Sequence, residues 1–465
     1  MKNKLTISKK DDNFREFALN GSLWLLLLQV GFPLAVNQSM NAIFKLLDSM
    51  IASHISAESV SAVAYLSQIN HILSAVGGGL AVGSSLHISR TYGAGDYKQV
   101  KTYVSTLFAM SGVLGLFLLC LIPFTPVILR LANTPEELIT IGSRYFSIEL
   151  FALVITFINN VYIAIERSRG NSRRILTLNL FVITVKLCLT AFFVYVLNSD
   201  ITMIGVATVI SQSIMLAVGL YNMTKTDSAF SFSFKKISFR WRTIAPMLSI
   251  SFPVMVEKSA FSAGKAIVNS MGSSYGSLTI GALGISNTIN GFTSSAQNGF
   301  QDGCSAIISQ NVGAGNRKRA LESFKKLLCI NISVGIIGFT LTRLLIQPVS
   351  MLYATSNGLL NTEFQHLILS INFYDLIGGC VPLGVFSSCM SFLFGFGKTK
   401  LTLLLNFCRV FVFRIPVLWF LKNYTSVGPE SVGITMMVSN TLVAVMAFLV
   451  VLIVAHKEKC RPMAA

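Results

Sequence analysis

Long apolar segments alternate with short polar breaks along almost the whole chain. Four apolar runs, at 107–127, 146–165, 176–197 and 434–455, approach or exceed the roughly 20 residues that a helix needs to cross a bilayer. The runs between polar breaks predict twelve transmembrane helices, at 21–52, 59–86, 103–131, 143–165, 175–197, 201–222, 244–271, 278–307, 323–352, 364–394, 399–421 and 430–455. We therefore expect an all-α polytopic membrane protein without a single soluble core.

The composition agrees with this interpretation. Hydrophobic residues make up 53% of the 465 positions and charged residues only 12%, whereas soluble domains average about 25% charged residues. The first apolar segment has no small-residue cleavage site and is too long for a signal peptide, so we expect it to be retained. The eight cysteines contain no CxxC pair and indicate neither a metal site nor a disulfide framework.

The formal net charge of +18 follows from the distribution of basic residues. If both termini are cytoplasmic, most of the 37 basic residues fall in cytoplasmic segments, and only Arg130, Arg144, Arg343 and Lys422 fall in outside loops. We therefore expect a multi-pass protein of the plasma (inner) membrane with the lipid bilayer as its surroundings. Binding of nucleic acid is not needed to explain the charge.

The chain contains an internal repeat. FPLAVNQS (32–39) reappears as FPVMVEKS (252–259), and ISRTYGAGD (88–96) reappears as ISQNVGAGN (308–316), both displaced by 220 positions. A third pair, RGNSRRILTLN (169–179) and FGKTKLTLLLN (396–406), is displaced by 227.

The repeat predicts two six-helix bundles at 21–222 and 244–455, joined by a cytoplasmic linker at 223–243 and flanked by cytoplasmic tails at 1–20 and 456–465. Because each half has an even number of spans, the halves run parallel, and a substrate site is expected between them near the middle of the membrane.

The GAGD and GAGN loops indicate turns followed by helix starts. Glycine permits positive φ, and Asp96 or Asn316 is suited to cap the next helix. A P-loop would need a Lys-Ser/Thr pair and a preceding strand, which these loops lack. Energy for transport would therefore come from an ion gradient or a partner subunit.

Two six-helix halves, the early prolines Pro33 and Pro253, the GAGD/GAGN loops and the RSRGN/FGFGK loops together resemble the multidrug and toxic compound extrusion (MATE) transporters of the MOP flippase superfamily. The resemblance implies a two-lobed, V-shaped fold that works by alternating access. It also implies export of amphipathic, often cationic compounds in exchange for entering H⁺ or Na⁺.

The resemblance also implies roles for particular residues. In the N-terminal half, Asp48 and Thr208 match the family's polar cluster, while Lys186 and Thr190 stand where the family has Asn and Asp. In the C-terminal half, Glu257 matches the acid of helix seven.

Two further positions bear on the resemblance. Asn159 and Asn160 resemble the polar pair that lines the N-terminal cavity. The second acid of the C-terminal half has no clear match, because Asp375 lies too early in its helix.

Polar and charged residues inside the predicted spans need protein or water around them, because a charge at the centre of a bilayer costs about 2.5–3.5 kcal/mol. Asn37, Asn41, Lys45 and Asp48 share one face of the first helix. Asp48 pairs either with Lys45 on its own helix or with Lys186.

The pairing with Lys186 leads to a mechanism. Protonation of Asp48 would break the pair and let the first helix move about Pro33. A site that contains Lys186 and Thr190 in place of two ligands would repel a second cation, so we do not expect it to bind Na⁺.

The seventh helix also carries a proline and charged residues inside its predicted span. Glu257 follows Pro253, a second hinge, and either couples an ion or forms a structural ion pair with Lys258. Lys258 and Lys265 either line the central cleft, where they would favour anionic or zwitterionic substrates, or pack near the membrane rims. Two further intramembrane cations, Arg409 and Arg414, are expected to brace the eleventh helix.

These features predict a secondary antiporter that exports amphipathic organic compounds, cationic or zwitterionic, in exchange for H⁺ in preference to Na⁺. It would be a monomer with no cofactor besides the coupling ion. The alternative is a flippase for a lipid-linked or anionic substrate of the same superfamily. An enzyme is not indicated, because the sequence has no HExxH motif, paired His cluster or serine elbow.

Overall fold

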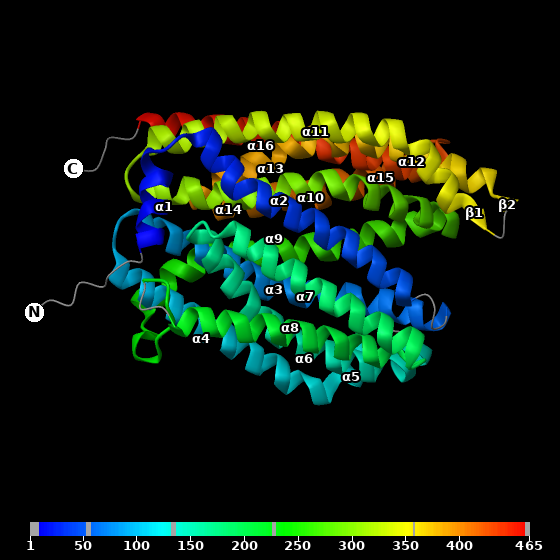
Figure 1. Ribbon diagram of the computed structural model, residues 1–465. Coiled ribbons are helices and arrows are strands. Elements are labelled where there is room, and N and C mark those ends of the chain that lie inside the picture. Colours follow the sequence, from blue (N-terminus) through cyan, green and yellow to red (C-terminus); the bar gives the residue numbers. More distant parts are fainter. Residues whose placement is uncertain (1–8, 53–56, 132–135, 226–228, 357–358, 461–465) are drawn as a thin grey trace, which may run out of the picture. The chain divides into compact units, whose positions relative to one another are not determined.

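The computed structural model describes residues 9–52, 57–131, 136–225, 229–356 and 359–460. Figure 1 shows a chain built almost entirely from long helices. The elements are α1 (Lys9–Asn20), α2 (Leu23–Ala52), α3 (Ala57–Gly93), α4 (Tyr97–Leu121), the 3₁₀ turn η1 (Ile122–Phe124), α5 (Thr125–Leu131), α6 (Glu136–Ser168), α7 (Ser172–Ala191), the π-helix η2 (Phe192–Val196), α8 (Ile201–Lys225), η3 (Phe234–Lys236), α9 (Trp241–Gly272), η4 (Ser273–Tyr275), α10 (Ser277–Gly313), α11 (Arg317–Ala354), β1 (Thr355–Ser356), β2 (Leu359–Leu360), α12 (Thr362–Gly379), α13 (Val381–Gly395), α14 (Thr399–Phe407), the π-helix η5 (Cys408–Arg414), α15 (Ile415–Tyr424), η6 (Gly428–Glu430) and α16 (Ser431–Cys460).

The predicted all-α fold class is confirmed. Each of the twelve predicted spans coincides with a helix or with consecutive helical segments, such as α12 and α13 for 364–394. Among the described residues, ten helical stretches are long and apolar enough to cross a membrane. The two remaining spans, α9 and α10, carry more polar side chains, as expected of helices that turn one face away from lipid.

The chain divides into two compact units. One comprises Met1–Gly21 and Ile43–Ser259, and the other comprises Ser22–Ala42 and Ala260–Ala465. One boundary lies between α1 and α2, and the other two fall inside α2 and α9. The sequence-defined halves at 21–222 and 244–455 instead keep α2 whole and all of α9 except its first three residues. The first part of α2 therefore packs with C-terminal helices, and the first part of α9 packs with N-terminal helices.

In the first unit, α6 lies centrally and packs against α3, α4 and α8. Its core holds large, fully buried side chains such as Tyr92, Phe146 and Phe230. In the second unit, α10 packs on α11, α12 and α13, and α16 packs on α12 and α13. These helices are drawn from green to red in Figure 1.

Close glycine contacts inside each unit reproduce the sequence repeat. In the first unit, a Cβ added to Gly79 would lie 2.6 Å from the Cα of Met255. In the second unit, a Cβ added to Gly299 would collide with the Cα of Ala35. Gly299 stands 220 positions after Gly79, and Met255 stands 220 positions after Ala35. The same packing of α3 on α9 thus recurs as α10 on α2, and this symmetry explains why both helices are divided between the units.

The turns of the repeated loops also have the predicted geometry. Gly95 and Gly315 adopt φ of +81° and +79°, which glycine tolerates because it has no Cβ. The Asp96 side chain accepts a hydrogen bond from the backbone N–H of Gln99, and Asn316 accepts one from Arg319. The interpretation of GAGD and GAGN as turns with helix caps is therefore confirmed.

The helix α1 was not predicted. Asp11, which is 1% exposed, accepts two hydrogen bonds from Arg169, at 3.0 and 3.1 Å. Arg169 also donates to Glu166 at 3.2 Å, and the Tyr92 hydroxyl donates to the backbone carbonyl of Asp11. The Phe14 ring packs against Gly170. The segment 1–20, interpreted from the sequence as a tail, thus includes a helix anchored by a buried ion pair between Asp11 and Arg169.

Candidate functional site

The second unit contains a polar cavity of about 280 Å³. Six elements of this unit line it: α9, α10, α12, α13, η5 and α16. Its charged lining residues are three cations, Lys265, Arg409 and Arg414, and one acid, Asp375. Three cations and one carboxylate leave an excess of positive charge in a membrane-spanning helical body.

A helix break positions Asp375. Helix α12 ends at Gly379, α13 begins at Val381, and Pro382 near the start of α13 cannot donate a backbone hydrogen bond. The carbonyl of Cys380, at the break, accepts a hydrogen bond of 2.8 Å from the Gln297 side chain. Discontinuous transmembrane helices of this kind commonly form substrate and ion sites in transporters.

Asp375 is held by neutral groups of α10. It is 5% exposed, and its Oδ2 accepts hydrogen bonds from Ser286 at 2.9 Å and from Asn290 at 2.8 Å. The Asn372 amide donates in turn to Ser286 at 3.2 Å. The carboxylate is therefore oriented by hydroxyl and amide donors and not by a cation.

The two arginines are brought together by the π-helix η5. In an α-helix, residues five apart point about 140° away from each other, but the i→i+5 bonding of a π-helix stacks them more nearly over one another. The backbone N–H of Ile415 donates to the carbonyl of Val410, five residues earlier. The next residue, Pro416, has no N–H to give, which favours this local rearrangement.

Arg409 and Arg414 share one neutral acceptor on α16. Arg409 donates to Asn440 Oδ1 through Nε at 3.1 Å and through Nη2 at 2.9 Å. Arg414, only 3% exposed, donates to the same oxygen at 2.9 Å and to the Ser439 hydroxyl at 3.2 Å. These bonds hold the predicted eleventh span, 399–421, against α16, so the expectation that the two arginines brace this span is confirmed. Both arginines also line the cavity.

Aromatic rings complete the cationic side of the cavity. The guanidinium of Arg409 lies 5.1 Å from the ring centre of Phe261 and 5.4 Å from that of Phe386. The ammonium of Lys265 lies 5.8 Å from the ring centre of Phe261. Such cation–π contacts stabilise a positive charge without neutralising it.

The predicted N-terminal polar pair is partly built into helix packing. Asn159, 2% exposed, donates to the backbone carbonyl of Gln212 at 2.9 Å and to its side chain at 2.8 Å. Asn160 is half-buried. Asn159 thus connects α6 to α8 within the first unit.

The other predicted residues of this unit lie on α7 and α8. Lys186 is half-buried on α7, and the Thr190 hydroxyl donates to the Lys186 backbone carbonyl at 2.9 Å. Thr208 donates in the same way to Ile204 at 3.1 Å. The donor capacity of both threonine hydroxyls is therefore used inside their own helices, and each keeps an acceptor oxygen.

The pairing of Asp48 on the first helix stays a prediction. The side chains of Lys45 and Asp48 lie outside the described residues, so the pairing of Asp48 with Lys45 or with Lys186 is not decided.

The buried polar positions of the first and seventh helices match across the repeat. Asn37 and Glu257, which are 220 positions apart, are 7% and 6% exposed. Pro33 and Pro253 are buried inside α2 and α9. Of the remaining predicted residues, Asn41 and Lys258 are half-buried. The side chain of Lys265 is exposed and lines the cavity described above.

Several candidate residues escaped the sequence analysis. Glu149, half-buried on α6, accepts a hydrogen bond of 2.8 Å from Asn70 on α3. It was visible as an acid within a predicted span. Asp375 was also visible but was set aside because of its position along the helix. The link between Arg409 and Arg414 had no sequence signal, because helical spacing separates them.

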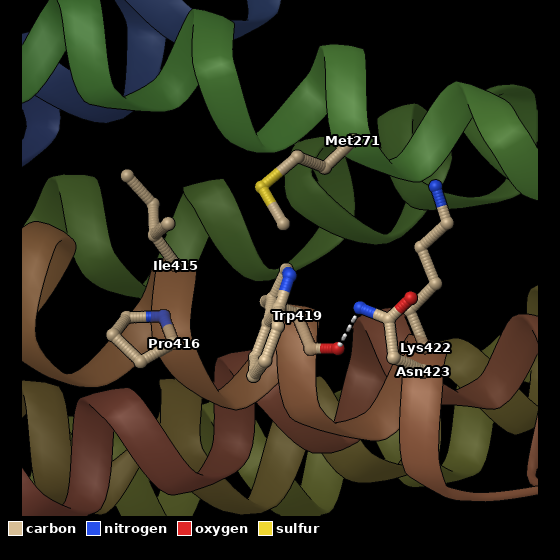
Figure 2. Close-up of a pocket in the computed structure, with 6 residues that line it drawn as sticks. All are labelled: Met271, Ile415, Pro416, Trp419, Lys422 and Asn423. Carbon is tan, nitrogen blue, oxygen red and sulfur yellow. Dashed lines mark hydrogen bonds between the residues drawn. The ribbon is translucent and has the colours of Figure 1, made fainter.

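A second hollow, of about 640 Å³, lies between the end of α9 and α15. Figure 2 shows Met271 facing Trp419, with Lys422 and Asn423 one turn further along α15. Asn423 donates to the carbonyl of Trp419 at 2.8 Å, so its amide serves the helix end. A Trp and a Lys at the end of a span are typical of the membrane–water interface. This hollow lacks the converging charges of the first cavity.

Comparisons with known proteins agree with this architecture. The MatE family model matches residues 33–192 and 253–420. The chain is 22% identical over 312 residues to the probable multidrug resistance protein YpnP of Bacillus subtilis, covering 64% of this chain and 67% of that protein. It is 20% identical to an FAD transporter of Shewanella oneidensis, covering 93% of this chain and 95% of that protein.

A solved structure has the same fold. A MOP superfamily transporter from Pyrococcus furiosus, described as having a binding pocket of reverse polarity, superposes with a TM-score of 0.90 at 18% identity. The superposition covers 98% of this chain and all of that one.

Proposed function

Because the chain belongs to the MatE family of multidrug and toxic compound extrusion transporters, we propose that it is a secondary active antiporter that exports amphipathic organic compounds by alternating access. The observation that carries this proposal is the buried, charged cavity formed by the α12–α13 break and η5 inside a membrane-spanning unit. Charged groups in such a position are costly in lipid, and they commonly mark substrate or ion pathways.

Entering H⁺, in preference to Na⁺, drives export in this proposal. The candidate carboxylates are Asp48, Glu149 and Glu257, all within helices of the first unit. In this proposal Lys186 pairs with Asp48 and disfavours a second cation, and Thr190 and Thr208 offer hydroxyl oxygens in place of further carboxylates. No cofactor besides the ion is proposed.

The placement in the cell is part of the same proposal. The excess of Lys and Arg in alternate loops supports cytoplasmic termini and a plasma (inner) membrane location. We propose a monomer in the bilayer whose substrate enters from the cytoplasm or the inner leaflet. Pro33 and Pro253, buried in α2 and α9, are the proposed hinges.

Transport by purified protein in proteoliposomes tests the proposal. A pH gradient and a Na⁺ gradient are imposed separately, and movement of a fluorescent amphipathic dye is followed. Uptake should follow the pH gradient in the wild type and fall in Asp48→Asn, Glu257→Gln and Lys186→Asn. Uptake that follows the Na⁺ gradient and ignores pH would contradict the proposed proton coupling. Chemical conversion of the substrate without any gradient would contradict the proposed transport function.

A flippase for a lipid-linked or anionic substrate is the second candidate. The arginine pair favours it, because two guanidinium groups suit a phosphate or pyrophosphate head group. The similarity to an FAD transporter also brings a phosphate-containing substrate into consideration. Scrambling of a labelled lipid-linked phosphate, with no movement of soluble amphipathic dyes, would favour the flippase over the exporter.

A further inference from the structure

In the cavity of the second unit, the half-buried guanidinium of Arg409 and the buried one of Arg414 have no carboxylate in direct contact among the described residues. Within the described residues, neither Arg409 nor Arg414 forms an ion pair, and their hydrogen bonds go to Asn440 and Ser439, which are neutral. Buried charges in proteins are normally paired, because an unpaired one loses its hydration without compensation. This arrangement is therefore expensive unless something else supplies negative charge.

Asp375, the acid of the cavity, accepts hydrogen bonds from neutral side chains and not from the two arginines. Its Oδ2 accepts hydrogen bonds from Ser286 and Asn290 on α10. It reduces the positive potential of the cavity but does not bind either guanidinium directly. With Lys265 included, the lining still carries three cations for one carboxylate.

The guanidinium groups keep donors for a ligand. Each arginine side chain has five N–H donors. Arg409 uses Nε and Nη2, and Arg414 likewise uses Nε and Nη2. The Nη1 groups of both therefore remain for an anion such as a carboxylate or a phosphate, whose oxygens arginine binds with well-defined geometry.

Two neutral side chains offer acceptors in the same cavity. Asn290 and Gln297 are 5% and 1% exposed, and their amide nitrogens are occupied. The side-chain oxygens of both, Oδ1 and Oε1, have no hydrogen-bond partner. Buried acceptors of this kind are normally satisfied, so a hydroxyl or N–H group on the ligand would complete the site.

The size and walls of the cavity limit the ligand. About 280 Å³ is near the lower end of the roughly 300–1,000 Å³ typical of ligand pockets. Phe261 and Phe386 flank Arg409 and present apolar faces. One anionic group and about one aromatic ring fit this space.

We propose that this cavity binds an organic anion, its carboxylate or phosphate held by Arg409 and Arg414 and its hydroxyl or N–H groups facing Asn290 and Gln297. The inference rests on the proposed transport function and specifies its substrate class as anionic, in place of the cationic or zwitterionic compounds expected from the family resemblance. Asp375 opposes the anion and limits its affinity, as a site that must release its ligand requires.

Equilibrium binding to the full-length protein in detergent tests the site without requiring transport. The probes are benzoate, para-hydroxybenzoate and phenyl phosphate, with benzyltrimethylammonium as a cation of similar size, measured by calorimetry. The anions should bind and the cation should not. The para-hydroxyl group should tighten binding relative to benzoate, because it donates to an unpartnered amide oxygen.

Variants separate this site from general damage to the fold. Arg409→Gln and Arg414→Gln should each weaken binding of the anions by about tenfold or more, because each removes one charged donor. Arg343→Gln, which removes an exposed arginine of the same unit outside the cavity, should leave binding unchanged. Asp375→Asn should tighten binding by about tenfold, because it removes the opposing charge; a damaged protein would not bind more tightly.

The outcomes distinguish this inference from the transport proposal. If benzyltrimethylammonium binds and the anions do not, or if Asp375→Asn weakens anion binding, the inference is wrong while dye transport in proteoliposomes stands. If the anions bind as expected but no gradient moves any dye, the anion site stands and the export proposal fails. Geranyl pyrophosphate provides the lipid-linked arm: displacement of phenyl phosphate by geranyl pyrophosphate but not by benzoate would assign the anion to a lipid head group.

Discussion

Arg409 and Arg414 donate hydrogen bonds of 2.9 Å to the same atom, Oδ1 of Asn440. One carboxamide oxygen thus holds two guanidinium groups whose mutual repulsion it offsets only in part. The arrangement keeps both cations facing the cavity. A substitution at Asn440 therefore changes the charge next to both arginines at once.

Asn440→Asp should change binding without loss of stability. A carboxylate at this position would neutralise part of the charge on both arginines, so anion binding should fall by about tenfold or more. The thermal unfolding temperature should stay the same or rise. Asn440→Ala should instead lower stability by about 1.5–3 kcal/mol for each charged hydrogen bond that is lost. Unchanged phenyl phosphate binding in Asn440→Asp would contradict the role assigned to the arginine pair.

Gly79→Ala should destabilise the first unit. Its Cβ would lie 2.6 Å from the backbone of Met255, which leaves no room without a shift of α3 or α9. Overpacking of this kind costs about 1–3 kcal/mol. Gly78→Ala is the matched control, because a Cβ at Gly78 meets nothing within 4 Å, and the added helix propensity should stabilise slightly. Thermal unfolding in detergent compares the two variants, and equal melting temperatures would argue against close packing of α3 on α9.

Glu149→Gln should reduce proton-driven transport. Glu149 is a titratable carboxylate inside a candidate span and accepts a hydrogen bond from Asn70; the amide cannot carry a proton across. We expect dye uptake under a pH gradient to fall by about tenfold or more, while binding of the anionic probes in detergent is retained. Glu363→Gln, at an exposed position in the first turn of α12, should transport normally. Normal transport by Glu149→Gln would return the coupling role to Asp48 and Glu257.

Asp11→Asn should loosen α1 from the first unit. It removes the charge that pairs with Nε and Nη2 of the buried Arg169, and breaking such a pair costs about 3–5 kcal/mol. Hydrogen exchange of α1 measures the effect. Asp12→Asn, at an exposed neighbouring position, is the control and should leave exchange unchanged.

Arg169 itself should not make the docking of α1 sensitive to pH. Burial lowers the pKa of Arg169, but the carboxylates of Glu166 and Asp11 more than offset this effect, so that the pKa is raised above its ordinary value. A raised pKa means that the contribution of the cation is complete below the ordinary value and is lost only as pH rises through the higher one. Deprotonation of Arg169 should therefore not reduce the protection of the α1 amides from hydrogen exchange between about pH 6 and 10.

The sequence was sufficient for the membrane-spanning helices, the repeat and the turns of the repeated loops, but not for α1. Lipid leaves no water to satisfy backbone groups, so long apolar runs must be helical. The displacement of 220 positions then paired α3 with α10, which both have 37 residues. The positive φ of Gly95 and Gly315 followed from local chemistry alone.

The candidate site was only partly predictable. Lys265 was selected because a lysine inside a membrane span needs protein or water around its charge, and its side chain does line the cavity. Asp375 was judged by its position along a continuous helix, but the break after Gly379 changes what that position faces. Arg409 and Arg414 could not be paired from sequence, because their spacing is wrong for an α-helix.

By itself, then, the sequence determined that this protein is a membrane-spanning, internally repeated helical chain with charges that must be sheltered from lipid. Only the tertiary structure decided that α2 and α9 are each divided between the units and that α9, α12 and η5 bring their charged side chains to one cavity. The reason is physical. Hydropathy and turn chemistry act within a few residues, whereas the meeting of Gly299 with Ala35, or of Arg409 with Asn440, depends on packing between distant segments.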